Sequence, residues 1–205
     1  MASNISMKQL ALLFSLLCLF VFLCGCAEAP PPGDQVVPEQ PVTEDWVPDG
    51  TVGEGEYHYS QQLSDSMTIH WRTTETTLQM ALVGRAEGWV GIGFGTGRMA
   101  SGIDYIVGYV DGDAVVRDMY SESPRCPIVA DTDLGGRDDI IRSGGSQRDG
   151  ITTIEFERPL DTGDPYDHVL EAGEAIPIIW ALSDTHDIGV RHRERGTATI
   201  TLREV

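Results

Sequence analysis

The chain has 205 residues, enough for one domain of ordinary size or two very small ones. Acidic residues outnumber basic ones by 32 to 14, and the formal net charge is -18. This charge argues against nucleic acid as a partner, because affinity for phosphates comes from Lys and Arg. It also disfavours docking on anionic lipid through a basic patch. Hydrophobic residues make up 41% of the chain, so general disorder is excluded.

The N-terminus has the pattern of an export signal. Lys8 begins a short positive region, and the apolar run Leu10–Leu23 follows it. These 14 residues are typical of a signal peptide and too short to span a bilayer comfortably. The run ends in Leu23-Cys24-Gly25-Cys26, which resembles a bacterial lipobox in which Cys26 is lipidated. We therefore predict a lipoprotein signal peptide over residues 1–25. An ordinary cleaved signal peptide and an uncleaved anchor are the alternatives.

Residues 26–54 are predicted to be the lipidated cysteine and a tether. Between Ala27 and Gly50 the sequence has six of the 11 prolines, six acids and no basic residue. Such a stretch should be extended and self-repelling rather than packed. It would hold a folded domain, predicted over residues 55–205, outside the cytoplasm at the cell envelope. By resemblance to Gram-negative lipoproteins, Ala27 after the cysteine favours the outer membrane. Cys126 is then alone, so no intrachain disulfide is expected.

Short segments with alternating apolar residues begin after Gly55. Clusters of Gly, Asp, Pro and Ser separate them, and no sustained helical period occurs. This pattern predicts an all-β fold, an antiparallel sandwich or barrel. Residues 121–148 are predicted to be mostly loop, with a short strand at Ile140-Ile141. The predicted strands are Met67–Arg72, Leu78–Leu82, Trp89–Gly95, Asp104–Val110, Ala114–Met119, Ile151–Glu157, Ala175–Leu182 and Thr197–Leu202.

One predicted strand has glycine at every second position. In it Gly91, Gly93 and Gly95 share one face, which weakens a strand because no side chain packs there. Two interpretations are equally open: a bend or crowded crossing of the sheet, or room for a flat ligand on the backbone.

Catalytic motifs are missing from the sequence. It contains no nucleophile elbow, zinc-protease motif or phosphate-binding glycine loop, so we predict no enzyme. Asp131, Asp133, Asp138 and Asp139 could bind calcium. Their spacing differs from that of an EF-hand loop, which favours solvated loop charge.

Several segments, in the same order, resemble the DOMON domain family. The resemblance covers roughly residues 55–203 and implies an Ig-like antiparallel β-sandwich that binds haem b or sugars outside the cytoplasm. The segments are Trp89–Gly95, Met99–Asp111, Asp149–Thr162, Ile178–Ala181 and His192–Gly196.

In haem-binding members of this family one Met and one His hold the iron, and the matching positions are Met99 and His192. Thioether and imidazole ligands together favour electron transfer over oxygen binding. The haem b would be non-covalent, since the sequence has no Cys-x-x-Cys-His motif. Arg98, beside Met99, could pair with a haem propionate.

Each proposed ligand also has an ordinary explanation, because a loop methionine can fill a gap and a histidine in a charged run can face solvent. His186 is the rival iron ligand, in the same loop as His192. His70 alternates with polar residues and is expected to face solvent. Trp89 and Tyr105 could line the haem or fill the sandwich.

The resulting hypothesis is a lipid-anchored, extracytoplasmic electron-transfer module of the cytochrome b type. Because the chain ends at Val205, we expect an unidentified redox partner to be a separate protein. The alternative is a haem-free DOMON module that binds a sugar or another small ligand. A purely structural or adhesive surface domain is the third possibility.

Overall fold

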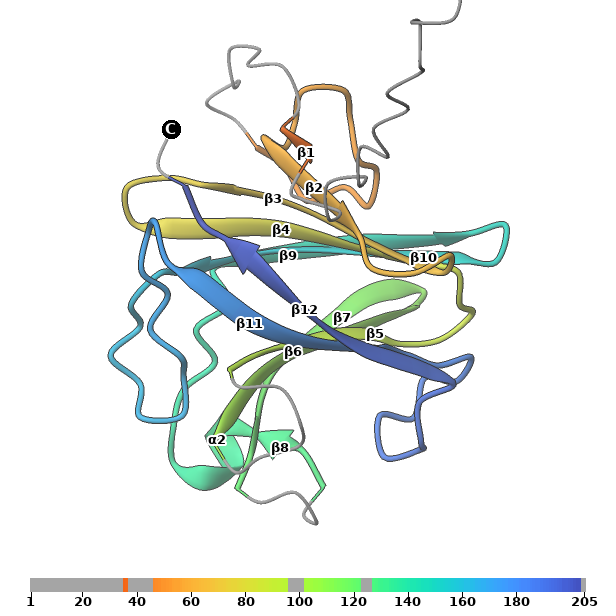
Figure 1. The fold of residues 1–205 in the computed structure, drawn as a ribbon. Coiled ribbons are helices and arrows are strands. Elements are labelled where there is room, and N and C mark those ends of the chain that lie inside the picture. The colour runs from red at the N-terminus through yellow and green to blue at the C-terminus, as the bar shows by residue number, and fades with distance from the viewer. Residues whose placement is uncertain (1–34, 37–45, 96–101, 123–126, 204–205) are drawn as a thin grey trace, which may run out of the picture. The chain divides into compact units, whose positions relative to one another are not determined.

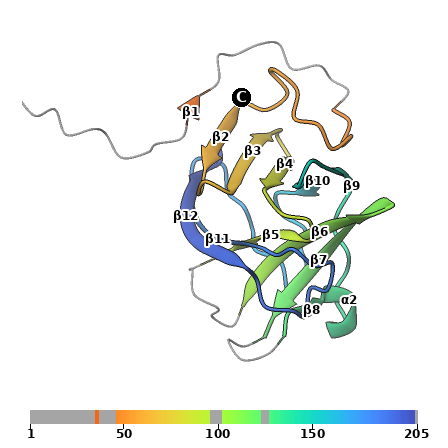
Figure 2. The same ribbon diagram turned by 90° about the vertical axis from the view of Figure 1, so that its right-hand side faces the viewer.

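The computed structural model describes residues 35–36, 46–95, 102–122 and 127–203, which all belong to one compact unit, Gly33–Val205. These residues form two six-stranded antiparallel sheets, and the two views separate them as layers (Figures 1 and 2). Sheet A has the strand order β1 (Gln35–Val36), β2 (Tyr59–Gln62), β3 (Met67–Thr73), β4 (Thr77–Gly84), β10 (Ile151–Pro159) and β9 (Arg142–Arg148). Sheet B has the order β12 (Glu194–Thr201), β11 (Ala175–Leu182), β5 (Val90–Phe94), β6 (Ile103–Asp111), β7 (Asp113–Ser121) and β8 (Val129–Ala130). The one-turn helix α2 (Asp131–Leu134) follows β8.

The core lies between the sheets and follows the alternation of the sequence. Trp71 from sheet A and Ile92 and Phe94 from sheet B are fully buried in it, and the residues that alternate with Val90, Ile92 and Phe94 on β5 are glycines. Apolar residues at alternate positions point to one face of a strand, so burying that face selects the register. The predicted all-β, Ig-like antiparallel sandwich is confirmed.

The outer face of sheet A is covered by the segment 46–57, which corrects the predicted tether. Trp46 and Tyr57 are buried there, although the tether was expected to run unpacked to residue 54. The Tyr57 hydroxyl donates a hydrogen bond to Glu155 Oε1 at 2.6 Å, and the Gly50 N–H donates to Glu155 Oε2 at 2.6 Å. His70 lies against the Tyr57 ring, with centroids 6.0 Å apart, and is half-buried rather than solvent-facing.

Residues 142–148 form β9, where the sequence predicted loop. A Cβ on Gly144 would lie 1.7 Å from the carbonyl oxygen of Pro48. This glycine therefore admits the covering segment onto an edge strand. The chain turns at Asp149 and Gly150, which both have positive φ, as a tight hairpin requires. The predicted strand at Ile140-Ile141 is not formed.

Among the described residues, no helix is long and apolar enough to cross a membrane.

Candidate functional site

The outer face of sheet B carries a second apolar layer, separate from the core. Trp89, Tyr105 and Val107 are buried in it, and Ile179 and Ala181 of β11 pack against them. An antiparallel sheet at a protein surface normally turns polar side chains outward. An apolar outer face therefore indicates a surface that something covers.

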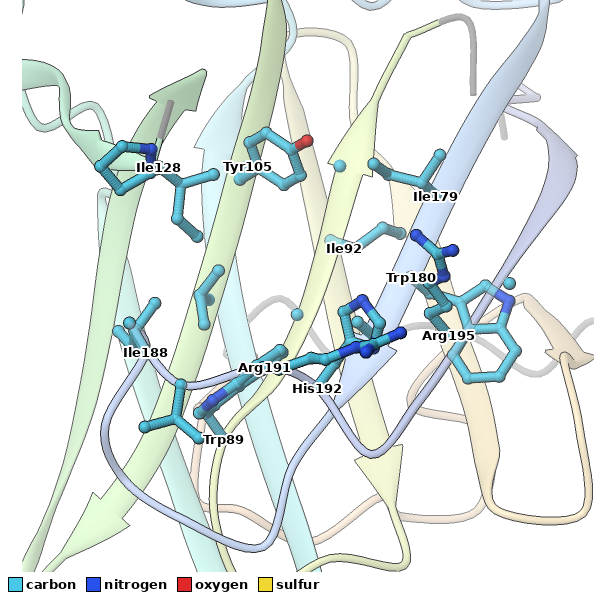
Figure 3. A pocket seen from close by; sticks show the side chains of 18 of the residues that line it. Trp89, Ile92, Tyr105, Ile128, Ile179, Trp180, Ile188, Arg191, His192 and Arg195 are labelled. Atoms are coloured by element: carbon cyan, nitrogen blue, oxygen red, sulfur yellow. The ribbon is translucent and has the colours of Figure 1, made fainter. Parts of the chain in front are cut away.

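Part of this layer opens into a cavity of about 1070 Å³ (Figure 3). Strands β5, β6 and β11 form its floor, and the connection from β11 to β12 closes over it with Ile188 and residues 189–192. The volume lies at the upper end of the range of about 300–1,000 Å³ for small-molecule and cofactor sites. The cavity can hold a ligand the size of a large planar cofactor.

Glycines of β5 form the centre of the floor. A Cβ on Gly93 would lie 2.9 Å from side-chain atoms of Ile103, Tyr105 and Ile179, and a Cβ on Gly91 would lie 3.0 Å from Val107 Cγ2. Side chains of neighbouring strands therefore pack close to these glycines. Both glycines also line the cavity. The crowded interpretation of the glycine strand is confirmed, whereas room for a flat ligand on its backbone stays a prediction.

His192 reaches the cavity from the β11–β12 connection, beside Arg191 (Figure 3). The connection is fixed behind it, because the Arg193 N–H donates to the carbonyl of Leu182 at 2.8 Å. Burial lowers the pKa of His192, and the nearby charges of Arg195 and Arg191 lower it further. The imidazole is therefore neutral at neutral pH, which leaves a nitrogen lone pair for a metal.

Two aromatic side chains line the same cavity as the imidazole. Trp89 is 6% exposed, and its Nε1–H is buried without a partner within the described part of the chain. Because a buried indole N–H is usually paired, this donor favours a ligand with an acceptor atom. Burial raises the pKa of Tyr105, so its phenol stays protonated.

The structure brings together three of the predicted site residues: Trp89, Tyr105 and His192 line one cavity. Met99 and Arg98 lie outside the described residues, as does Cys26. The rival His186 does not line the cavity; its ring stacks on Tyr109, with centroids 5.0 Å apart and planes 15° from parallel.

Sequence reasoning missed Ile179 and Ala181 of β11. Ile178 and Trp180 belong to the core, whereas Ile179 and Ala181 belong to the outer apolar layer, so both faces of this strand are apolar. Trp180, Ile179 and Ala181 all line the cavity. A run of apolar residues on both faces is the signal that identifies a strand covered on both sides.

A DOMON domain model matches residues 63–183, more than half of the chain. The chain belongs to the DOMON domain family. It is 27% identical over 138 residues to the DBH-like monooxygenase protein 1 of Mus musculus, a match that covers 66% of this chain and 22% of the mouse protein. The chain thus spans less than a quarter of that relative. The fold is similar to the crystal structure of the cytochrome b domain of pyranose dehydrogenase from Coprinopsis cinerea, at a TM-score of 0.49 and 18% identity, covering 65% of this chain and 75% of that chain.

The cavity of this DOMON domain depends on close packing at Gly88. A Cβ there would lie 2.2 Å from the backbone nitrogen of Thr185 and 2.3 Å from its carbonyl oxygen. The same two segments are joined by hydrogen bonds from Trp89 N–H to Thr185 O at 3.1 Å and from Ser183 N–H to Trp89 O at 2.9 Å. The residues just before β5, which include Trp89, therefore pack against the β11–β12 connection, which includes His192.

We expect Gly88→Ala to lower the free energy of unfolding by about 1–3 kcal/mol, because backbone atoms must move to admit the methyl group. Urea unfolding measures the loss. Gly53→Ala is the matched control, since the nearest atom to its Cβ is the flexible Glu56 carboxylate at 3.3 Å. Equal stability of the Gly88 variant and the wild type would contradict the tight contact.

Proposed function

We propose that this DOMON domain binds haem b non-covalently in the cavity on sheet B and serves as an electron-transfer module, with Met99 and His192 as the axial ligands. The observation that carries the proposal is the apolar cavity of about 1070 Å³ with a neutral imidazole at its wall. Haem bound there would supply one-electron redox chemistry.

The residues present fit such a group. The apolar floor of Gly91, Gly93 and Val107 offers a flat surface without polar atoms that would need water. The guanidinium groups of Arg191 and Arg195 line the same cavity and are exposed, so they can pair with carboxylates at the edge of a macrocycle while those carboxylates stay hydrated.

His192 would donate its lone pair to the iron from the β11–β12 connection, with a thioether from Met99 as the second ligand. Two protein ligands leave no open position for oxygen, so the domain would relay electrons rather than activate oxygen. The apolar floor with the buried Trp89 and Tyr105 would limit the access of water to the group, and in this class of site such a shell controls the reduction potential.

A haem-free module that binds a sugar is the alternative. Sugars are bound through many hydrogen bonds, whereas most of the described cavity lining is apolar and Thr197, His192 and two arginines supply most of its polar side chains. The lining therefore favours haem over a sugar.

The test is an absorption spectrum of the protein produced in an oxidising compartment with haem available, before and after dithionite. We expect a Soret band in the oxidised protein and sharp α and β bands after reduction. A colourless protein that also fails to take up added haem would contradict the proposal and would direct attention to sugars and other small ligands.

We further propose that a lipid on Cys26 holds the domain at the cell envelope, outside the cytoplasm, and that it exchanges electrons with a separate protein. The support is the Leu23-Cys24-Gly25-Cys26 motif after the apolar run. Mass spectrometry of the intact protein from a membrane fraction tests this, because a lipidated mature chain would begin at Cys26.

A further inference from the structure

A second group of polar residues lies inside the sandwich, away from the haem cavity. One carboxylate oxygen from each of Asp104, Asp118 and Asp167 lies within 4.8 Å of the other two, and these three residues are called the aspartate cluster below. Asp104 is on β6 and Asp118 is on β7, while Asp167 follows β10.

The pairing of β6 and β7 explains how two acids meet. Asp118 is opposite Ile106 in the register, and Asp104 is two residues before Ile106 on the same strand. Both side chains therefore project from the core face of sheet B as diagonal neighbours. Asp104 is 1% exposed and Asp118 is 5% exposed, so neither carboxylate is solvated by bulk water.

In two of these carboxylates the protein holds one oxygen and leaves the other without a partner. Asp104 Oδ2 accepts hydrogen bonds from Arg158 Nη1 and from the backbone N–H of His168, and Asp118 Oδ2 accepts from the backbone N–H of Asp139 at 3.0 Å. The Oδ1 atoms of Asp104 and Asp118 are buried, with no hydrogen-bond donor within the described ranges. The groups are thus fixed in place with a free oxygen each, as metal ligands are.

Asp131 adds a fourth buried acid beside the cluster. It is 1% exposed, and both of its carboxylate oxygens are buried and unpartnered within the described part of the chain. Burial, followed by the charges of Asp167 and Asp104, raises its pKa to about 7. The sequence-based interpretation of Asp131 as solvated loop charge is therefore wrong.

The charges of this region do not balance. Against Asp104, Asp118, Asp131 and Asp167 stands the buried Arg158, which pairs with Asp104 and lies 3.6 Å from Asp167 Oδ2. Burying unpaired carboxylates is costly, and a protein relieves that cost either by keeping them protonated or by binding a cation.

We propose that the aspartate cluster binds a calcium ion. All of the donors are hard oxygen atoms, which suit Ca²⁺ and Mg²⁺ rather than zinc or copper. With Ca²⁺–O distances of about 2.3–2.6 Å, opposite ligands are about 5 Å apart, so oxygens within 4.8 Å of one another fit a shared ion. Mg²⁺ at about 2.1 Å would draw its ligands closer and keeps several waters, which a dry interior does not provide.

This ion would join three segments that the chain order separates: β6, β7 and the segment after β10. Tyr105 follows Asp104 on β6 and lines the cavity on the other face of the sheet. The calcium site would therefore fix the strand that forms part of the cavity floor. It does not depend on the haem proposal, since none of its ligands lines that cavity.

The test is calorimetric titration of the full chain with CaCl₂ after removal of metals with EGTA. We expect one ion per chain and a rise in Tm of about 5–10 °C at a hundredfold excess over Kd. Asp118→Asn should weaken Ca²⁺ binding at least about tenfold without lowering the Tm of the metal-free protein, because it removes a buried charge. Asp167→Asn is the second variant, in case the first fails to fold.

Asp133→Asn is the matched control, because Asp133 is an aspartate of the neighbouring helix α2 that is exposed. It should bind Ca²⁺ like the wild type. Absence of Ca²⁺ binding by the wild type would overturn the proposal and would mean that the carboxylates are kept protonated. An equal response to MgCl₂ would overturn the assignment to calcium. Both readouts are independent of haem, so they hold whether or not the protein is coloured.

Discussion

His192→Ala should abolish the low-spin spectrum of the haem-loaded protein and weaken haem retention by more than about tenfold. The imidazole lines the cavity, and its lowered pKa leaves it neutral and able to ligate iron at neutral pH. Loss of groups that merely orient a ligand already costs about 10–100-fold in metal affinity, so removal of the ligand itself should cost at least as much. Absorption spectra of the oxidised and reduced variant measure the change.

Two other histidines provide controls for this result. His186→Ala removes a ring that stacks on Tyr109 outside the cavity, and His70→Ala removes a ring beneath Tyr57 on the other sheet. Both variants should keep the low-spin bands. An unchanged spectrum in the His192 variant together with a lost one in the His186 variant would transfer the ligand role to His186. Met99→Ala should behave like His192→Ala.

The sandwich could be predicted because the sequence patterns that indicate its strands and turns are local. Period-two alternation in Met67–Trp71 and Val90–Phe94 marks strands with one face of large apolar side chains, and glycine with aspartate marks the hairpins between them. Strand β9 was not predicted because Gly144 serves a close contact with Pro48, almost a hundred residues earlier. A glycine used for close approach and a glycine used for a turn look the same in a sequence.

The site was only partly predictable. Resemblance to a family indicated His192, Trp89 and Tyr105, and the structure places all three in one cavity. The role of Ile179 depends on which segment closes over sheet B, and that is a property of the assembled fold.

The aspartate cluster could not be predicted from the sequence, because it too is a property of the assembled fold. Its members stand at positions 104, 118 and 167, a spacing without a motif, and only the pairing of β6 with β7 and the packing of the two sheets bring them together. The acids that the sequence grouped by proximity, such as Asp133 and Asp138, are exposed.

Arg158→Met should lower the free energy of unfolding of the metal-free protein by about 3–5 kcal/mol, the largest stability loss expected from a single change here. Arg158 is 1% exposed, and Asp104 and Asp167 raise its pKa although burial alone would lower it. Methionine can fill much of the same space beside Phe94, over whose ring the guanidinium lies at 5.6 Å. The loss would therefore come from the carboxylate of Asp104, left buried with its charge uncompensated.

Urea unfolding in the presence of EGTA measures this loss, and a double-mutant cycle assigns it to the ion pair. Adding Asp104→Asn to Arg158→Met should recover part of the stability, since the buried charge is then gone. Arg137→Met is the control: its side chain is 58% exposed and lies 3.5 Å from Asp139, so its loss should cost less than about 1 kcal/mol. If Arg158→Met cost no more than this control, Asp104 would already be neutral in the folded protein, and a cation bound at the aspartate cluster would have one charged ligand fewer.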